Sequence, residues 1–195
     1  MSNSMTEKMK ELINETILRK VPVISSFDSI VFTRGRPLVI CDIDETILYL
    51  DSTESYKSYN SKFPLFYSKH HSLLSGANYC IDPLYRYILP TDIEGFRRLE
   101  QRISSLDGKL IFLTARHPST SRYVVEDFSR IGLDSSKYEI HYTGNTITKG
   151  EYIRARINLS GYNNLYFIDD LKDNIVSVYH FFPQTNLYLF RRIGL

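Results

Sequence analysis

The 195-residue sequence predicts an α/β fold, a Rossmann-like parallel sheet with helices on both faces, and three observations support this prediction. Short apolar runs bounded by turn residues recur along the chain. Segments with helical periodicity separate these runs, and glycines lie near the ends of several of them. Strands that alternate with helices are typical of parallel sheets with right-handed crossovers. In such sheets, ligands bind beyond the carboxyl ends of the strands.

The individual elements follow from apolar spacing. Residues 6–19 are expected to form an amphipathic helix that packs over the core, because apolar residues recur there at spacings of three to five. The first strand is expected at residues 38–41, a continuous apolar run that indicates burial on both faces. Later strands are expected at 110–113, 138–142, 165–168 and 186–190, and helices at 91–105, 119–131, 149–159 and 171–181, with Gly108, Gly132 and Gly161 as stop signals.

Residues 49–90 lack a clean period and are rich in Tyr, Phe, Ser and Asn, so we expect a small insertion after the first strand. A segment of this length rarely folds alone. The chain is therefore expected to be a single domain, 1–195, in which residues 1–36 form an N-terminal helix and lead-in. The aromatic side chains of the insertion are expected to pack on the core or to cover the site as a small cap: Tyr56, Tyr59, Phe63, Phe66, Tyr67, Tyr79, Tyr85 and Tyr87.

Charge and composition assign no partner. The formal net charge is +2, so no global field favours nucleic acid, membrane surfaces or acidic ligands. The chain has only Cys41 and Cys80, and it has neither an apolar stretch of membrane-spanning length nor a signal-peptide core, so we expect a soluble, cytoplasmic protein. The arginine clusters at 97–102 and 191–192 are expected to be solvated faces rather than nucleic-acid contacts. Oligomeric state has no signal in the sequence.

Polar residues follow each predicted strand at its carboxyl end. Asp42 and Asp44 come directly after the first strand, and an acid next to an apolar strand must be paired or metal-bound to be tolerated. After the second strand, the Thr114 hydroxyl and the N–H groups of the next two residues could hold an anion. Lys149 begins a helix after the third strand, where a lone lysine is usually a surface residue. Asp169 and Asp170 follow the fourth strand.

Four carboxylates at one sheet edge predict a divalent cation. Two bare carboxylates about 4 Å apart repel by roughly 4 kcal/mol at an effective dielectric near 20. Several such pairs would consume the roughly 5–15 kcal/mol that stabilises a typical domain. Ligands that are all oxygen favour Mg²⁺, which also recruits substrate phosphate. The five histidines show no zinc-like spacing.

These residues resemble the four motifs of the haloacid dehalogenase (HAD) superfamily, in order and at the expected strand ends. Asp42-x-Asp44-x-Thr46 matches the first motif, Thr114 the second and Lys149 the third. Asp169-Asp170, with Asp173 or Asn174, matches the fourth. The resemblance runs from about residue 37 to 190 and is greatest to phosphatases of the capless or small-cap type. The joint match is far more specific than any one motif.

The resemblance implies an Mg²⁺-dependent phosphomonoester hydrolase that acts through an aspartyl-phosphate. Asp42 would be the nucleophile, and Asp44 would protonate the leaving oxygen and then activate water. The Mg²⁺ would be held by Asp42, the backbone carbonyl of Asp44, and Asp170, with Asp169 as the less certain ligand. The phosphoryl group would be bound by Thr114, Lys149, Ala115 and Arg116, and supporting roles would fall to Thr46, Asp173 and Asn174.

Other functions remain open. A phosphotransferase or phosphomutase of the same superfamily shares every motif and differs only in the acceptor. A catalytically idle HAD-like binding module would not need these residues intact. A phospho-accepting receiver domain places its acid pair after the first strand and its lone acceptor aspartate after the third, and the order of motifs in this chain argues against it. Only 20 residues separate Lys149 from Asp169, which leaves no room for a large cap there, so the substrate is expected to be a phosphorylated small molecule or an oligonucleotide end.

Overall fold

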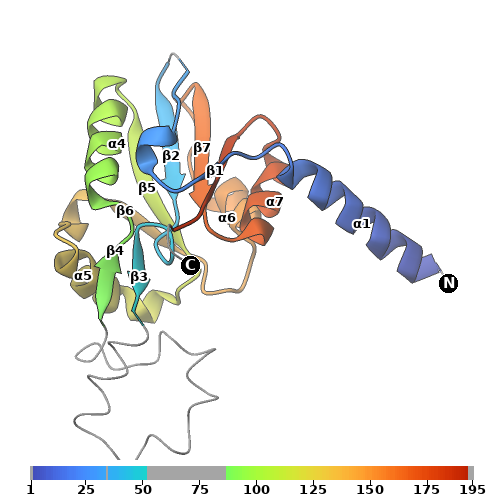
Figure 1. Cartoon of the computed structure of the whole chain (residues 1–195), viewed down its shortest axis with the longest axis horizontal. Helices are drawn as coiled ribbons and strands as arrows, with labels where there is room; N and C mark the ends of the chain where they lie inside the picture. The colour runs from blue at the N-terminus through green and yellow to red at the C-terminus, as the bar shows by residue number, and fades with distance from the viewer. Residues whose placement is uncertain (1, 34, 52–86, 193–195) are drawn as a thin grey trace, which may run out of the picture.

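A computed structural model describes residues 2–33, 35–51 and 87–192, and its centre is a six-stranded sheet in which every neighbouring pair is parallel (Figure 1). In spatial order the strands are β1 (Val23–Ile24), β8 (Asn186–Phe190), β7 (Asn164–Asp169), β2 (Pro37–Cys41), β5 (Lys109–Thr114) and β6 (Glu139–Tyr142). The predicted parallel α/β architecture is confirmed.

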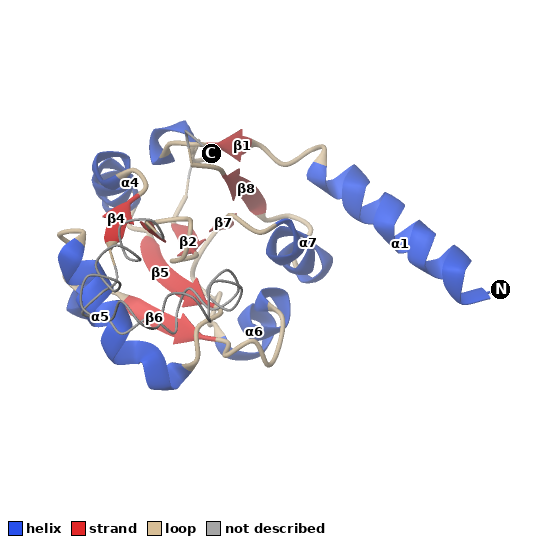
Figure 2. Cartoon of the chain, turned by 60° about the horizontal axis from the view of Figure 1, so that its bottom comes forward, coloured by secondary structure: helices blue, strands red, loops and turns tan. Residues whose placement is uncertain are grey.

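Helices cover both faces of the sheet (Figure 2). The helices α4 (Ile93–Ser105) and α5 (Ser121–Arg130) lie on one face, and α6 (Lys149–Arg156) and α7 (Lys172–Phe181) lie on the other. Strand β2 is buried throughout, and its side chains alternate between the two layers: Val39 packs in the α4–α5 layer and Ile40 in the α6–α7 layer. This double burial explains why the strand reads as an unbroken apolar run.

The topology defines where a ligand can enter. From β2 the chain steps outward to β5 and β6, then returns to the other side of β2 to form β7 and β8. The connecting helices change face between α5 and α6, so the carboxyl ends of β2, β5 and β7 lie at a topological switch point. Open α/β sheets bind ligands in the crevice at this position.

The predicted strands after residue 37 and the predicted helices are all present, with ends that shift by a few residues. Helix α6 stops at Arg156 rather than 159, because Ile157 adopts an extended backbone. The helix expected from 119 begins as a 3₁₀ turn, Pro118–Thr120, before α5. The edge strand β1 was not predicted, since two residues carry no periodicity.

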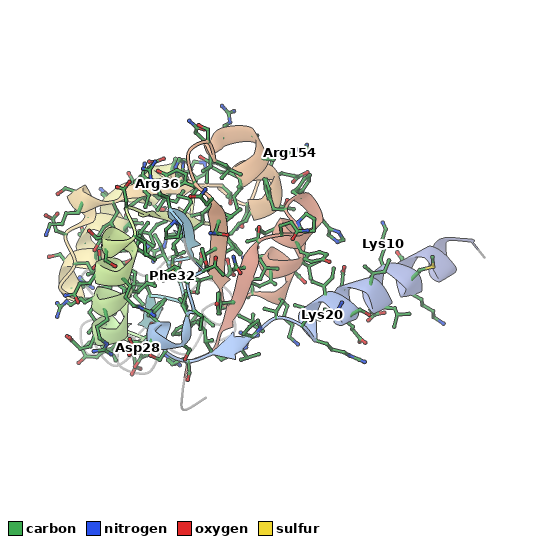
Figure 3. The ribbon with its side chains drawn as sticks, turned by 90° about the horizontal axis from the view of Figure 1, so that it is seen from above. Lys10, Lys20, Asp28, Phe32, Arg36 and Arg154 are labelled. Atoms are coloured by element: carbon green, nitrogen blue, oxygen red, sulfur yellow. The ribbon has the colours of Figure 1, made fainter. Side chains whose placement is uncertain are left out.

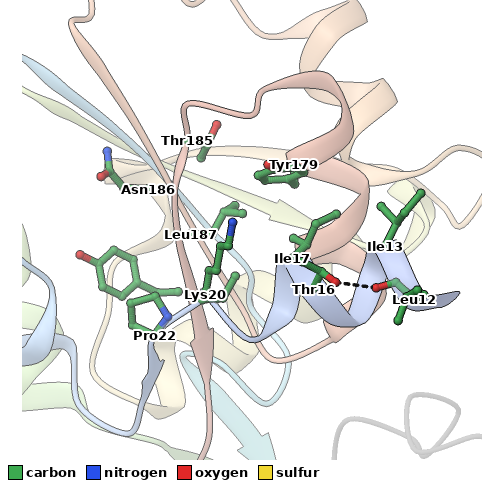
Figure 4. Close-up of a pocket in the computed structure, with 12 residues that line it drawn as sticks. Leu12, Ile13, Thr16, Ile17, Lys20, Pro22, Tyr179, Thr185, Asn186 and Leu187 are labelled. Atoms are coloured by element: carbon green, nitrogen blue, oxygen red, sulfur yellow. Dashed lines mark hydrogen bonds between the residues drawn. The ribbon is translucent and has the colours of Figure 1, made fainter. Parts of the chain in front are cut away.

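Helix α1 (Ser2–Leu18) forms as predicted, but the expectation that it packs over the core is wrong. Only its C-terminal end meets the sheet layer, where Ile17 is buried and faces Tyr179 of α7 (Figure 4). Met9 and Leu12 are 63% and 62% exposed, and the helix projects away from the domain (Figures 1 and 3). The reason is the direct connection from α1 into the edge strand β1, which directs the helix outward from the sheet edge.

The predicted insertion begins and ends on an antiparallel ribbon, β3 (Leu48–Leu50) paired with β4 (Ile88–Pro90). Residues 52–86 lie outside the described part of the chain, including Cys80 and every predicted cap aromatic except Tyr87, which is half exposed. The cap therefore stays a prediction, as does the single-domain organisation. Among the described residues, no helix is long and apolar enough to cross a membrane.

Candidate active site

The nucleophile candidate Asp42 lies at the switch point, directly after β2. Its backbone N–H donates to the Ile168 carbonyl at 2.9 Å, which extends the β2–β7 ladder by one residue. The register pairs Cys41 with Ile168, so Asp42 and Asp169 lie beside each other at the ends of neighbouring strands. Both side chains point toward the α6–α7 layer, because they follow the alternation of the strands that carry them.

Lys149 bridges these two acids. Its Nζ forms an ion pair with Asp42 Oδ1 and lies 2.7 Å from Asp169 Oδ2, with all three side chains buried. Burial raises the pKa of Asp42 well above its usual value; Lys149 lowers it and Asp169 raises it further. Burial lowers the pKa of Lys149, but the two carboxylates outweigh this effect and raise it overall, so the lysine stays charged. Lys149 is thus a buried cation, in contrast to the surface position that a lone lysine usually takes.

Local sequence explains why Lys149 points inward. It occupies the first turn of α6, whose N-cap Thr148 forms a capping box with Glu151. The next residue, Gly150, lies so close to α7 that a Cβ there would be 2.2 Å from the Ser177 carbonyl oxygen. Only glycine permits this approach, which presses the start of α6 against α7 and fixes the lysine at the sheet edge.

Three carboxylates form a set that fits a hard cation. Asp42, Asp169 and Asp170 each offer an oxygen, and these atoms lie within 4.8 Å of one another. Burial and the neighbouring Asp169 raise the pKa of Asp170 to about 7. Repulsion of this kind among all-oxygen donors is what a bound divalent ion relieves. Asp169 already accepts hydrogen bonds from Lys149, the Leu171 N–H and Asn174, which makes Asp170 the better-suited ligand.

The residues after Asp42 form a tight turn. The N–H groups of Ile47 and Leu48 both donate to the Ile43 carbonyl, at 2.9 and 3.2 Å, and Glu45 adopts a left-handed backbone with φ 58°. Within this turn Thr46 is fully buried, and its carbonyl accepts a hydrogen bond from Thr91 Oγ1 at 2.5 Å. The turn directs Asp44 back toward the end of β5.

Asp44 is held there by Arg116. The guanidinium Nε lies 3.0 and 3.2 Å from the two carboxylate oxygens, and Nη2 lies 2.5 Å from Oδ1. The Thr114 hydroxyl is 3.4 Å from Asp44 Oδ2 and accepts a hydrogen bond from the Arg116 N–H. On its other side Arg116 Nη1 donates to Asp127 Oδ2 at 2.8 Å, within α5. The arginine expected to bind phosphate is therefore shared by two carboxylates.

The carboxyl ends of β2, β5 and β7, together with the first residue of α6, carry the four predicted motifs in the expected order. This arrangement is the one that the resemblance to the haloacid dehalogenase superfamily implies. No protein-family model and no curated protein matches the chain. Matching solved structures include a class C acid phosphatase from Bacillus anthracis with tungstate bound, with 16% identity and a TM-score of 0.45, covering 83% of this chain and 68% of that one.

Two further solved structures are of the same degree of likeness. The HAD domain of the effector protein Lem4 from Legionella pneumophila, an inactive mutant, has 14% identity and a TM-score of 0.43, and the match covers 82% of this chain and 86% of that one. The Pnkp1/Rnl/Hen1 complex has 13% identity and a TM-score of 0.43, with 86% of this chain matched to 51% of that one. Likeness of this degree carries no argument about activity or substrate.

Seven of the candidate residues line a cavity of about 490 Å³. Asp42, Asp44, Ala115, Arg116, Lys149, Asp170 and Asn174 contribute to its wall. Asn174 donates to both oxygens of Asp169, whereas Asp173 is exposed and lies outside this wall, so the geometry favours Asn174 in the supporting role. The predicted phosphate contacts of Ala115 and Arg116 stay predictions.

Sequence reasoning missed several residues of the site. Glu45, His117 and Asn145 from loops and Tyr123 from α5 also line the cavity, and nothing in their local sequence marks them as site residues. Asp127 was missed as well, although a signal existed. It lies between Val124 and Phe128 on the apolar face of α5, where an acid needs a buried partner.

Proposed function

We propose that the chain is an Mg²⁺-dependent phosphomonoester hydrolase that acts through an aspartyl-phosphate intermediate. The observation that carries this proposal is the placement of Asp42 beside Lys149 and Asp170, with Asp44 in the wall of the same cavity. One carboxylate is thus held by a buried cation at the ligand-binding edge of the sheet, and a second is exposed enough, at 16%, to exchange protons with a ligand.

The reaction proceeds in two balanced steps. An oxygen of Asp42 attacks phosphorus, the P–O bond to the leaving group breaks, and Asp44 gives a proton to the departing oxygen. Asp44 then takes a proton from water, whose oxygen attacks the same phosphorus and releases Asp42 and inorganic phosphate. A single residue acts first as acid and then as base, so the site returns to its starting protonation state.

The remaining residues bind and orient the phosphoryl group. Lys149 supplies positive charge next to Asp42, and the Thr114 hydroxyl and the N–H group of Ala115 lie at the end of β5, where phosphoryl oxygens would bind. Asp42, the Asp44 carbonyl and Asp170 would hold Mg²⁺, with Asp169 as a further candidate. When bound, the ion offsets the charge of these acids and polarises the phosphoryl oxygens.

We propose hydrolysis as the reaction and keep transfer to another acceptor as the alternative, and intact candidate residues argue against an idle binding module. The substrate is proposed to be a phosphorylated small molecule or an oligonucleotide end. Assays across nucleotides, sugar phosphates, phosphopeptides and 3′-phosphorylated oligonucleotides would distinguish these classes. An Asp42-bound phosphoryl group that passes to a sugar or nucleotide rather than to water would indicate a phosphotransferase or phosphomutase.

The proposal is tested with p-nitrophenyl phosphate. We expect hydrolysis that requires Mg²⁺, is lost on chelation and is abolished by Asp42→Asn. Asp44→Asn is expected to reduce turnover at least about 100-fold, the lower range for general acid–base catalysis. Glu126→Gln, which removes an exposed carboxylate from α5, is the matched control and should leave activity unchanged. Activity that survives Asp42→Asn would exclude Asp42 as the nucleophile.

A further inference from the structure

The buried carboxylate of Asp127 is not explained by packing. It is fully buried on α5, between Val124 and Phe128, where the side chains around it belong to the main apolar core. Placing a charge in such surroundings costs several kcal/mol unless it is paired. Buried ion pairs can often be replaced by apolar residues without loss of stability. Its partner, Arg116, also contacts Asp44 of the candidate site.

Arg116 presents its two edges to different carboxylates. One edge, Nη1, is fixed by Asp127 at 2.8 Å, and the other, Nε with Nη2, faces both oxygens of Asp44. A guanidinium is planar and rigid, so a contact at one edge sets the direction of the opposite edge. The arginine side chain is only 5% exposed, and the Asp127 side chain is not exposed. Asp127 therefore fixes the plane of Arg116 relative to α5, and Arg116 in turn fixes the orientation of Asp44.

We propose that Asp127 is a positioning residue that acts through Arg116 to orient the carboxyl group of Asp44 for proton transfer to the leaving group. This inference rests on the proposed function, in which Asp44 is the acid. It assigns Asp127 no contact with substrate. Displacement of a catalytic group by about 1 Å can cost on the order of 100-fold in rate, so a residue beyond the cavity can govern the proton-transfer step.

The inference is tested by comparing two leaving groups. The nitrophenolate of p-nitrophenyl phosphate departs without a proton, whereas the alkoxide of glycerol phosphate needs one. Asp127→Leu removes the acceptor for Arg116 and keeps an apolar volume. We expect it to lower kcat/KM on glycerol phosphate at least about 10-fold more than on p-nitrophenyl phosphate, within the range that general acid catalysis supplies. Asp127→Asn keeps an oxygen acceptor and should restore much of this difference.

Val124→Ala is the matched control. It creates a cavity in the same buried face of α5 and keeps both Asp127 and Arg116, so it should lower Tm and leave the ratio of the two kcat/KM values unchanged. In an Asp44→Asn chain, adding Asp127→Leu should change that ratio no further. If Asp127→Leu does not fold, Arg116→Lys, which keeps the charge and loses the two-edged contact, takes its place.

Equal losses on both substrates in Asp127→Leu, or a changed ratio in Val124→Ala, would overturn the positioning role while leaving the phosphatase proposal intact. Absence of hydrolysis of either phosphate by the wild-type chain with Mg²⁺ would overturn the proposed function, and this inference with it. The two failures are therefore distinguishable.

Discussion

Asp170 should destabilise the metal-free protein at neutral pH, and Asp170→Asn should remove that effect. The pKa of this carboxyl group rises from 3.8 to about 7 on folding, through burial and the proximity of Asp169. Because the folded value lies above the unfolded one, the unfavourable effect is absent below pH 3.8, grows through the acid range and is complete above about pH 7.

The magnitude follows from this shift. A difference of about three pH units corresponds to about 4 kcal/mol at 1.36 kcal/mol per unit. Partial contact with water screens the charge and reduces the figure to about 2 kcal/mol. For a chain of this length, about 2 kcal/mol shifts Tm by roughly 4–8 °C. Asp170→Asn should therefore melt roughly 4–8 °C above the wild type at pH 8 in EDTA.

Thermal unfolding monitored by circular dichroism measures this difference in Tm between the wild type and Asp170→Asn. The gap between the two chains should fall to less than half by pH 5, where folded Asp170 is mostly protonated. Mg²⁺ should stabilise the wild type more than the variant, which lacks one ligand. Asp173→Asn is the control: it removes an exposed charge from the first turn of α7 and should lower Tm slightly. Identical melting of wild type and Asp170→Asn at pH 8 in EDTA, or a gap that does not change with pH, would refute the reasoning.

Three further outcomes are expected. Mg²⁺ at 100 times its Kd should stabilise the wild type by about 2.7 kcal/mol, measured as a Tm increase that EDTA reverses. Lys149→Met should lower the free energy of unfolding by about 3–5 kcal/mol in EDTA, measured with urea, because it leaves Asp42 and Asp169 buried without their cation; Mg²⁺ should recover part of this loss. Thr148→Ala should cost about 1 kcal/mol in the same assay, because it removes the N-cap of α6.

The sheet and its ligand edge were predictable because burial on both faces leaves a strong signal. Strand β2 reads as an unbroken apolar run, and once a parallel sheet is inferred, residues that follow its strands must meet at one edge. Asp42 and Asp169 were placed correctly for this reason. The same logic does not predict β1, because a strand of two residues carries no periodic signal. It also does not predict how α1 packs, because the sequence shows the apolar face of the helix but not what that face contacts.

Pairings between distant elements were less accessible. Arg116, which follows β5, contacts Asp44 from one loop and Asp127 from a helix, and its predicted phosphate contact says nothing of these two carboxylates. Which carboxylate a cation meets depends on tertiary distances that no local pattern contains. Asp127 could have been flagged as an acid on an apolar helix face, but its partner could not have been named.

Each of the two buried cations of the site forms ion pairs with two carboxylates, which affects how a phosphate can bind. Lys149 lies between Asp42 and Asp169, and Arg116 lies between Asp44 and Asp127, so four carboxylates meet two positive charges before Asp170 is counted. A phosphate dianion entering this wall meets a net negative site. We therefore expect inorganic phosphate to raise Tm only when Mg²⁺ is present, and sulfate, at the same ionic strength, to serve as the comparison. Stabilisation by phosphate in EDTA would show that Lys149 or Arg116 releases a carboxylate to bind the anion, contrary to the charge balance inferred for this wall.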